Sequence, residues 1–565
     1  MIALFKRFFL NLIYVISASI YTLKACGYSL IGTDDANIYF IYMRNLANGD
    51  GFVYNVGHEK VEGFTSILWT VLGAIAFKIS SNPQWILFCL NILFISILMT
   101  KLSGMLERLL EDKKLQYLAK FTLLSLLFII PGYFDWTTLA QMETGLWSML
   151  IVLSSCIVVE MNWHENYRKS GIQLAIIMLI SFWTRPESLL WNLIFIGLFF
   201  GNISLKSKSV KKGIISSIPL AIVYFIGLFT LIAWRLDYFG YPLPNTYYAK
   251  VTESRLNNLF HGANYFLKYI IFYNPFIVVI LSLFFYWIVQ NFKDNILSEK
   301  NRPISILILL SLANFAIPAL NGGDFFPYGR FYIALMPIVY TLFIVLLIQK
   351  LKKQLEKIYW KTYAIVLLGL FMVSFMPLKP KLLQIIPDSR FESPMKHEFN
   401  IAQNGRNIGN GMNAFFEQNK YYPSLGVTGA GGIGFTYRGY INDVLGLNNT
   451  KMAHADKKLS GDFKLRNHAS FNKEVFYAQA PELFIMPRLI SDTTNFEIWD
   501  HKKNVDDEWL SRVFKHIYND EKFKKLYQPV FIIKQKDQSI VHAYMHQKLR
   551  DKLNPDLYQI INIKR

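Results

Sequence analysis

The feature that most constrains the fold of this chain is a succession of long apolar runs. A helix needs about 20 apolar residues to cross the hydrocarbon core of a bilayer, and several runs reach that length. Soluble domains rarely combine 53% hydrophobic residues with only 17% charged residues. The sequence therefore predicts a polytopic α-helical membrane protein. We expect about eleven spans, at residues 8–25, 84–104, 117–133, 143–161, 170–183, 187–203, 213–234, 270–291, 303–320, 331–350 and 361–377.

Basic residues gather in alternate loops between these runs. The clusters are residues 6–7, 101–120, 168–169, 206–212, 293–302 and 350–361. Cytoplasmic loops of membrane proteins carry an excess of Lys and Arg, so this pattern places the N-terminus in the cytoplasm. It also accounts for much of the net charge of +20 without nucleic acid, which we do not expect as a partner. The lipid bilayer itself is the expected partner of the basic loops.

Five unusual polar segments fall in the loops that this orientation places outside. They are the loop with Asp34 and Asp35, and residues 131–144, 184–187, 234–250 and 322–331. Because all five lie on one side of the predicted membrane, we expect them to form one extracytoplasmic site. The first outer loop, residues 26–83, is long; its apolar spacing predicts an interfacial helix over 36–48 and a half-inserted helix over 64–78, closed by Asn82-Pro83.

The character of the chain changes at about residue 379. Residues 379–565 contain no further apolar run, and polar residues and glycines appear in globular proportions. Helical patterns at 398–418 and 471–480 alternate with short apolar runs typical of strands at 424–428, 483–486 and 529–534. We therefore expect a transmembrane catalytic domain at 1–378 and a C-terminal extracytoplasmic α/β domain at 379–565.

Several motifs carry little functional weight. Residues 429–434 fit GxGxxG after a strand-like run, but the acid that a dinucleotide site needs about twenty residues later is missing, so we expect a structural turn. The ten histidines are scattered, which argues against a zinc site. Cys26, Cys89 and Cys156 lie in or beside predicted spans and read as small buried apolar residues. We expect no organic cofactor.

Asp34 and Asp35 form an adjacent carboxylate pair just after the first predicted span. Two neighbouring carboxylates repel each other and are costly to desolvate near lipid. Their retention there favours one acting as a base or both acting as ligands. A solvated loop with two acids is the alternative, and a divalent cation shared by the pair also stays open.

Other charged residues lie in the same outer segments. Arg185 sits between apolar runs beside Glu187, where a guanidinium is costly unless it meets an anion, either a phosphate or a structural Glu partner. The same argument applies to Arg330, which needs an anion, either a phosphate or the nearby Asp324. The segment with Asn245, Tyr247, Tyr248 and Lys250 suits a lipid or sugar groove, and equally an interfacial aromatic belt.

Six motifs occur in a fixed order along residues 32–331. They are DDANIYFIYMRNLANGDGFVYN, VEGFTSILW, METGLW, TRPE, YFGYPLPNTYYAK and GGDFFPYGRF, and AGGIGF with INDVLGLNN follows at 430–449. Together they resemble the bacterial GT-C type integral-membrane glycosyltransferases, close to the terminal arabinofuranosyltransferases of the mycobacterial cell envelope. The resemblance is weakest over residues 455–565.

The resemblance implies a polyprenyl-phosphate-linked sugar donor, a glycan, lipid or protein acceptor, and inverting transfer at the outer face of a bacterial inner membrane. It assigns the catalytic acid to the first outer loop, where we favour Asp34 as the base, with Asp35 close behind. The transferred sugar stays open. The donor- and substrate-binding candidates are Arg44, Glu62, Glu143, Arg185, Glu187, Asn245, Tyr247, Tyr248, Lys250, Asp324 and Arg330.

Two other classes of function remain. A transporter of lipid-linked sugars would carry its polar residues near the middle of the membrane, whereas here they gather at one face. A non-catalytic glycan-binding envelope component would have no need of the Asp34–Asp35 pair.

Overall fold

The computed structural model describes residues 2–250, 255–292, 295–355, 394–455, 470–490 and 508–563. The chain forms two compact units. The helical unit consists of Met1–Leu30, Asn82–Leu231 and Arg255–His397, and the sheet unit of Ile31–Ser81, Ile232–Ser254 and Glu398–Arg565. Each unit is thus assembled from three separate stretches of the sequence.

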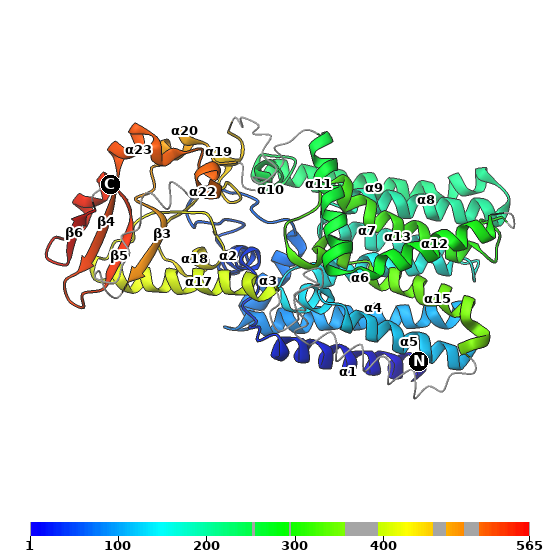
Figure 1. The fold of residues 1–565 in the computed structure, drawn as a ribbon. Helices are drawn as coiled ribbons and strands as arrows, with labels where there is room; N and C mark the ends of the chain where they lie inside the picture. The colour runs from blue at the N-terminus through cyan, green and yellow to red at the C-terminus, as the bar shows by residue number, and fades with distance from the viewer. Residues whose placement is uncertain are drawn as a thin grey trace. The chain divides into compact units, whose positions relative to one another are not determined.

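The helical unit is a bundle of long apolar helices, in which α4, α5 and α15 lie side by side (Figure 1). Its helices are α1 (Ile2–Ala25), α4 (Pro83–Leu109), α5 (Lys113–Ile129), α6 (Thr144–Glu160), α7 (Tyr167–Phe182), α8 (Ser188–Ser207), α11 (Arg255–Lys268), α12 (Phe276–Asn291), α13 (Arg302–Leu320), α14 (Arg330–Ile333) and α15 (Met336–Leu355). Short π-helices, η1 (Asp135–Leu139) and η2 (Tyr269–Tyr273), and a 3-10 helix, η3 (Pro327–Gly329), lie in the connections between them. Helices α9 (Val210–Phe239) and α17 (Pro394–Phe416) contribute residues to both units.

Local sequence explains where several of these helices begin. Asp112 accepts a hydrogen bond from the backbone N–H of Leu115 and so caps α5. Asn166 caps α7 in the same way through the N–H of Lys169. Pro83 stands at the start of α4, where its missing N–H costs nothing.

Among the described residues, five helices are long and apolar enough to cross a membrane, or up to seven if each of two bent helix pairs is one span. The chain therefore has the helices of a multi-pass membrane protein, but the eleven expected spans are not confirmed. Three of them correspond to α5, α6 and α7, with 17, 17 and 16 residues. The run at 361–377 lies outside the described residues.

The sheet unit is built on a six-stranded mixed sheet in the order β2-β1-β3-β5-β4-β6. Strand β1 is parallel to β2 and β3, and the remaining neighbours are antiparallel. The strands are β1 (Leu425–Val427), β2 (Ile441–Asp443), β3 (Leu483–Ile490), β4 (Tyr527–Lys534), β5 (Ile540–His546) and β6 (Tyr558–Asn562). The helices are α2 (Asp34–Asn48), α3 (Ile67–Ile79), α10 (Asn245–Lys250), α18 (Gly432–Thr436), α19 (Thr450–Ala453), α20 (Lys473–Gln479), α22 (Glu508–Val513) and α23 (Glu521–Leu526).

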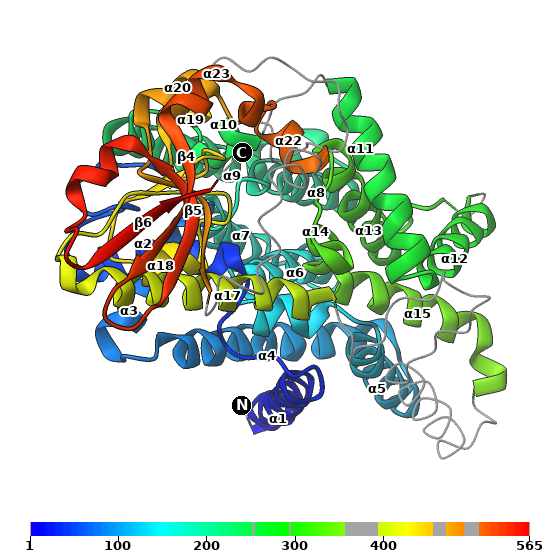
Figure 2. The same ribbon diagram turned by 60° about the vertical axis from the view of Figure 1, so that its left-hand side comes forward.

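The sheet is covered on both faces. Helix α17 runs along one side, and α20 and α23 lie on the other (Figures 1 and 2). An aromatic core fills the space under α20 and α23, where Phe476, Phe484, Phe523 and Tyr527 are almost fully buried. Their packing gives this part of the chain a hydrophobic core of its own.

The expected helices at 36–48, 64–78, 398–418 and 471–480 are confirmed, as are the expected strands near 425, 483 and 529. Strands β2, β5 and β6 were not predicted. Asn82-Pro83 does not close the second helix, because α3 already ends before Ser80 and Pro83 opens α4. The predicted boundary at 378/379 lies outside the described residues, and most of the first outer loop belongs to the sheet unit.

Candidate functional site

The carboxylate of Asp34 is clamped by two backbone amides of the glycine-rich turn. The N–H of Gly431 donates to Oδ2 at 3.0 Å, and the N–H of Gly432 donates to Oδ1 at 2.8 Å. Asp34 is the first residue of α2, whose N-cap Thr33 accepts from the N–H of Ala36. Because the turn leads from β1 into α18, strand, turn and helix together hold the carboxylate in one orientation.

The environment of Asp34 changes its acidity. Burial raises the pKa of this half-buried carboxyl from 3.8 to about 6, although the two glycine N–H groups lower it. The nearby carboxyls of Asp35 and Asp443 raise it further. Among the described residues, no Lys, Arg or His forms an ion pair with Asp34. The group is therefore ionised at neutral pH but takes up a proton more readily than an ordinary aspartate.

Asp35 is the neighbouring residue in the first turn of α2, and it is also half-buried. In the part of the chain that the structure describes, no three His, Cys, Asp or Glu side chains are grouped to hold a metal ion. A cation shared by the pair stays a prediction.

Two arginines lie around Phe435, close to the cap of α2. Arg44 donates to the carbonyl of Phe435 at 2.7 Å, and its guanidinium lies 5.1 Å from the ring centroid. Arg406 lies 4.5 Å from the same centroid and donates to Oδ1 of Asn37 at 2.7 Å. Burial lowers the pKa of Arg44, and lowers that of Arg406 to about 10. Neither forms an ion pair with a carboxylate among the described residues.

Glu62 has a structural partner that the sequence analysis missed. Arg235 donates to it from Nε at 2.9 Å and from Nη2 at 2.8 Å, and both side chains are buried. Burial raises the pKa of Glu62 to about 7, although Arg235 lowers it. The backbone carbonyl of Glu62 accepts from the N–H of Asn245 at 3.1 Å. The ion pair therefore fastens the first outer loop to the last turns of α9, and the hydrogen bond from Asn245 fastens it to the segment that follows.

The segment around α10 packs within the sheet unit. Asn245 donates to the carbonyls of Gly446 and Leu447 at 2.8 and 2.9 Å, which is a structural use of its amide. The ring of Tyr248 packs against that of His454 at an interplanar angle of 35°, with centroids 4.1 Å apart, whereas Tyr247 is exposed. Lys250 ends the helix and is half-buried.

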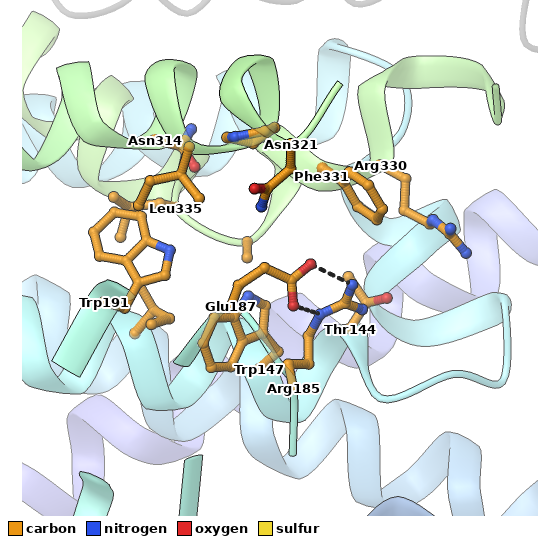
Figure 3. Close-up of a pocket in the computed structure, with 14 residues that line it drawn as sticks. Thr144, Trp147, Arg185, Glu187, Trp191, Asn314, Asn321, Arg330, Phe331 and Leu335 are labelled. Carbon is orange, nitrogen blue, oxygen red and sulfur yellow. Dashed lines mark hydrogen bonds and ion pairs between the residues drawn. The ribbon is translucent and has the colours of Figure 1, made fainter. Parts of the chain in front are cut away.

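In the helical unit, Arg185 holds two carboxylates at once. Its Nη1 donates to Oε1 of the fully buried Glu143 at 2.5 Å. Its Nε and Nη2 donate to the two oxygens of Glu187 at 3.0 and 2.9 Å, the paired contacts drawn in Figure 3. The structural Arg–Glu pair, left open by the sequence, is thus present.

Arg330 is held by Asp324 and by aromatic rings. Its Nε donates to Oδ2 of Asp324 at 2.7 Å, and the guanidinium lies 4.3 Å from the centroid of Phe326 and 5.3 Å from that of Trp136. The turn before it depends on Gly323, whose φ is +73° and whose missing Cβ would lie 2.4 Å from the Tyr265 ring. A side chain at residue 323 would therefore displace Tyr265.

Arg185 and Arg330 border a small enclosed cavity where α6 and α8 begin and α13 ends. Its volume is about 30 Å³, and Trp147, Trp191 and Asn321 also line it (Figure 3). A cavity of this size holds about one water molecule. The cluster counts three carboxylates, Glu143, Glu187 and Asp324, against two guanidiniums. A phosphate therefore enters only if an Arg–carboxylate contact opens.

The predicted site residues fall into two groups, one in each unit. The helical unit holds Glu143, Arg185, Glu187, Asp324 and Arg330, and the sheet unit holds Asp34, Asp35, Arg44, Glu62, Asn245, Tyr247, Tyr248 and Lys250. Within the helical unit, three predicted polar segments meet around the cavity. That all five outer segments form one site stays a prediction.

Sequence reasoning missed the partners rather than the charged candidates. Arg406, Arg235 and the amides of Gly431 and Gly432 were not singled out. Arg235 directly follows the apolar run 213–234, and that position was a usable signal for a buried ion pair. Nothing local points from Gly431 to Asp34, because 397 residues separate them.

Comparisons with known proteins give limited information. No protein-family model matches the chain, and no curated protein matches its sequence. The archaeal oligosaccharyltransferase AglB from Archaeoglobus fulgidus, solved with an inhibitory peptide and a dolichol-phosphate, is similar at 11% identity and a TM-score of 0.46, over 98% of this chain and 76% of that chain. The apo form of the oligosaccharyltransferase from the same organism gives 11% and 0.45, over 98% and 76%. Its complex with Zn and sulfate gives 11% and 0.43, over 97% and 75%. Similarity this low decides neither the fold family nor the activity.

Proposed function

We propose that the chain is an inverting glycosyltransferase that moves a sugar from a polyprenyl-phosphate-linked donor to a hydroxyl of a glycan, lipid or protein. The observation that carries the proposal is the amide clamp on Asp34. The order of motifs described above supplies the donor class. In this reaction the Asp34 carboxylate accepts the proton of the acceptor hydroxyl while its oxygen attacks the anomeric carbon. The bond to the donor phosphate breaks, and the phosphate leaves with the electron pair.

The clamp suits Asp34 to this task in two ways. Each carboxylate oxygen has two lone pairs, so accepting one N–H bond per oxygen leaves room for the acceptor proton. A general base works best when its pKa is near the working pH, and a value of about 6 meets that condition. No guanidinium or ammonium is paired with Asp34 among the described residues to lower its basicity.

The departing phosphate needs cations, and the proposal assigns this role to Arg185, Arg330 and Lys250. The planar guanidinium fork matches phosphate oxygens. In the structure, Glu187 accepts from Nε and Nη2 of Arg185, and Asp324 accepts from Nε of Arg330. The donor phosphate would therefore take the place of a carboxylate on at least one arginine, and the carboxylates hold the arginines in position until it does.

The test is sugar transfer by the purified protein from a panel of short-chain polyprenyl-phosphate sugars. Wild type is compared with Asp34→Asn and Asp35→Asn, and donor binding is measured in parallel. We expect Asp34→Asn to lower transfer about 1000-fold, within the range for general bases, while donor binding persists. The Asp35→Asn variant serves as the neighbouring control, and a larger loss there would move the base to Asp35.

Other outcomes would reject the proposal. Full activity in both variants would remove the aspartates from the chemistry. Donor binding or translocation without turnover by wild type would favour a transporter. Glycan binding without either would favour a binding component of the envelope.

A further inference from the structure

A second and larger cavity lies in the helical unit, and the glycosyl-transfer proposal makes no use of it. Its volume is about 690 Å³. It is formed where α4 passes into α5, where α12 and α15 end, and where α13 begins. Because helix ends of five elements meet there, it is a recess at one end of the bundle.

The two cavities lie at opposite ends of α13. Its last turns, with Asn314 and Pro318, line the small cavity, and Ile304 near its start lines the large one. Helix α15 runs the other way, from Leu335 just before its start to Lys352. The 19 residues of α13 span about 28 Å, close to the thickness of the bilayer hydrocarbon core. The large cavity is therefore at the level of the opposite membrane interface from the small one.

The lining of this recess is amphipathic. Lys300, Lys350 and Lys352 supply positive charge, and the Nζ of Lys350 lies 4.2 Å from the centroid of the Tyr286 ring. An apolar wall faces the same space; it consists of Leu115, Leu283, Trp287, Ile304 and Leu346. A phospholipid carries a charged phosphate next to apolar acyl chains, so basic groups beside an apolar wall complement it.

The surroundings of the recess favour lipid access. Phe285 and Val289 on α12 and Phe292 directly after it are 70%, 55% and 73% exposed. Exposed apolar groups on a bundle of this hydrophobicity are expected to face acyl chains. A lipid can therefore enter the recess sideways from the bilayer.

We infer that this cavity binds one anionic phospholipid, with its phosphate among the three lysines and an acyl chain along the apolar wall. Basic pockets between transmembrane helices on the cytoplasmic side commonly hold anionic headgroups, and the sequence predicts that side for these loops. Glu111 and Asp112 also line the recess, and Asp112 caps α5. Three lysines against two acids leave one net positive charge, which selects a lipid with net negative charge.

The test is a lipid competition on the purified full chain. Phosphatidylglycerol and phosphatidylcholine with the same acyl chains are added in equal amounts, and bound lipid is counted by native mass spectrometry. We expect wild type to prefer phosphatidylglycerol about fivefold, the effect of about one basic residue near an anionic headgroup. The triple variant Lys300→Ala, Lys350→Ala, Lys352→Ala should lose this preference, and Glu111→Gln should increase it.

A matched control removes the same charge elsewhere in the helical unit. Lys208 is an exposed residue between α8 and α9, and the exposed Lys211 and Lys212 lie in the first turn of α9. These three lysines do not line the cavity. Their triple alanine variant should keep the fivefold preference. Leu283→Trp, which fills the space beside the apolar wall, should weaken the binding of both lipids. Inorganic phosphate at about 10 mM should displace neither lipid.

Three results would overturn the inference. Equal binding of the two lipids by wild type would remove the charge selection. Equal loss in both triple variants would show attraction to the general surface charge. Displacement of phosphatidylglycerol by inorganic phosphate would show an anion site that does not hold the lipid.

Discussion

Two charged sites of this protein, one in each unit, hold buried charge in opposite ways. In the helical unit, Arg185 and Arg330 are each paired with carboxylates, and the cluster contains one carboxylate more than guanidiniums. In the sheet unit, Asp34 is held by backbone amides, while Arg44 and Arg406 have no carboxylate partner among the described residues. One arrangement neutralises charge pair by pair, and the other keeps opposite charges apart.

This difference determines what each arrangement can do chemically. Pairing with a guanidinium lowers the pKa of a carboxylate and weakens it as a base, although at Glu62 burial outweighs the effect of Arg235. A carboxylate held only by amides keeps its basicity, and burial raises the pKa of Asp34 to about 6. The Asp34 site is therefore suited to proton transfer, and the cluster of Arg185 and Arg330 to holding arginines in fixed positions.

The largest expected effect tests the pairing in the helical unit. Arg185→Ala leaves the fully buried Glu143 without its cation, and breaking such a pair costs about 3 to 5 kcal/mol of unfolding free energy. The measurement is the Tm of the protein in detergent. Adding Glu143→Gln should recover part of the loss because it removes the uncompensated charge. If the double variant is no more stable than Arg185→Ala, the pair is not what stabilises this end of the bundle.

The next effect tests the clamp in the sheet unit. A Cβ on residue 431 would lie 1.9 Å from the backbone carbonyl oxygen of Asp34, so Gly431→Ala must displace the turn. We expect a loss of about 2 kcal/mol in stability, the cost of a hydrogen bond to a charged group, and at least a tenfold loss of sugar transfer.

The same turn supplies the control for this variant. A Cβ on Gly429 would meet only Oδ2 of Asp34, at an ordinary 3.6 Å, so Gly429→Ala should keep both stability and transfer. Equal effects of the two substitutions would mean that the turn is sensitive to any side chain and that the clamp is not special.

The smallest effect is a dependence of stability on pH. The raised pKa of Asp34 means that the folded chain binds a proton more tightly than the unfolded chain between about pH 4 and 6. The contribution of this group to the free energy of unfolding is therefore fully present below about pH 4 and is lost as the pH rises through about 6. A rise of two pKa units corresponds to about 3 kcal/mol at most, and we expect about 1 to 2 for a half-buried group.

The difference between wild type and Asp34→Asn isolates this contribution, because Glu62, with a pKa of about 7, adds a fall of the same sign in both proteins. Tm measured from pH 4 to 7 should fall less steeply in the variant. Parallel curves would show that Asp34 has an ordinary pKa.

The sequence predicts those parts of the molecule that depend on local pattern. Helix α2, helix α17 and strand β4 follow from apolar spacing over a few residues, and their prediction is confirmed. Strands β2 and β6 have three and five residues, and β5 is buried along its whole length, so none of the three shows apolar and polar residues alternating over several positions. The eleven expected spans are not confirmed, because three of them correspond to helices of 16 or 17 residues and the run at 361–377 lies outside the described residues.

The candidate site shows the same limit. Charge type and position were enough to select Asp34, Arg185 and Arg330. The partners of Asp34 are backbone amides, which every residue has, so no residue type in the sequence signals them. Asp34 and Gly431 are also 397 positions apart in the sequence, so no pattern among neighbouring residues connects them.

That separation has a consequence for how the protein is made. Asp34 leaves the ribosome early, but its amide partners follow almost 400 residues later. At about 5 to 20 residues per second, the carboxylate waits roughly 20 to 80 seconds for the turn that orients it. A nascent chain that stalls before residue 431 therefore carries the acid without its clamp, so the proposed base is completed only after Gly432 has been added to the chain.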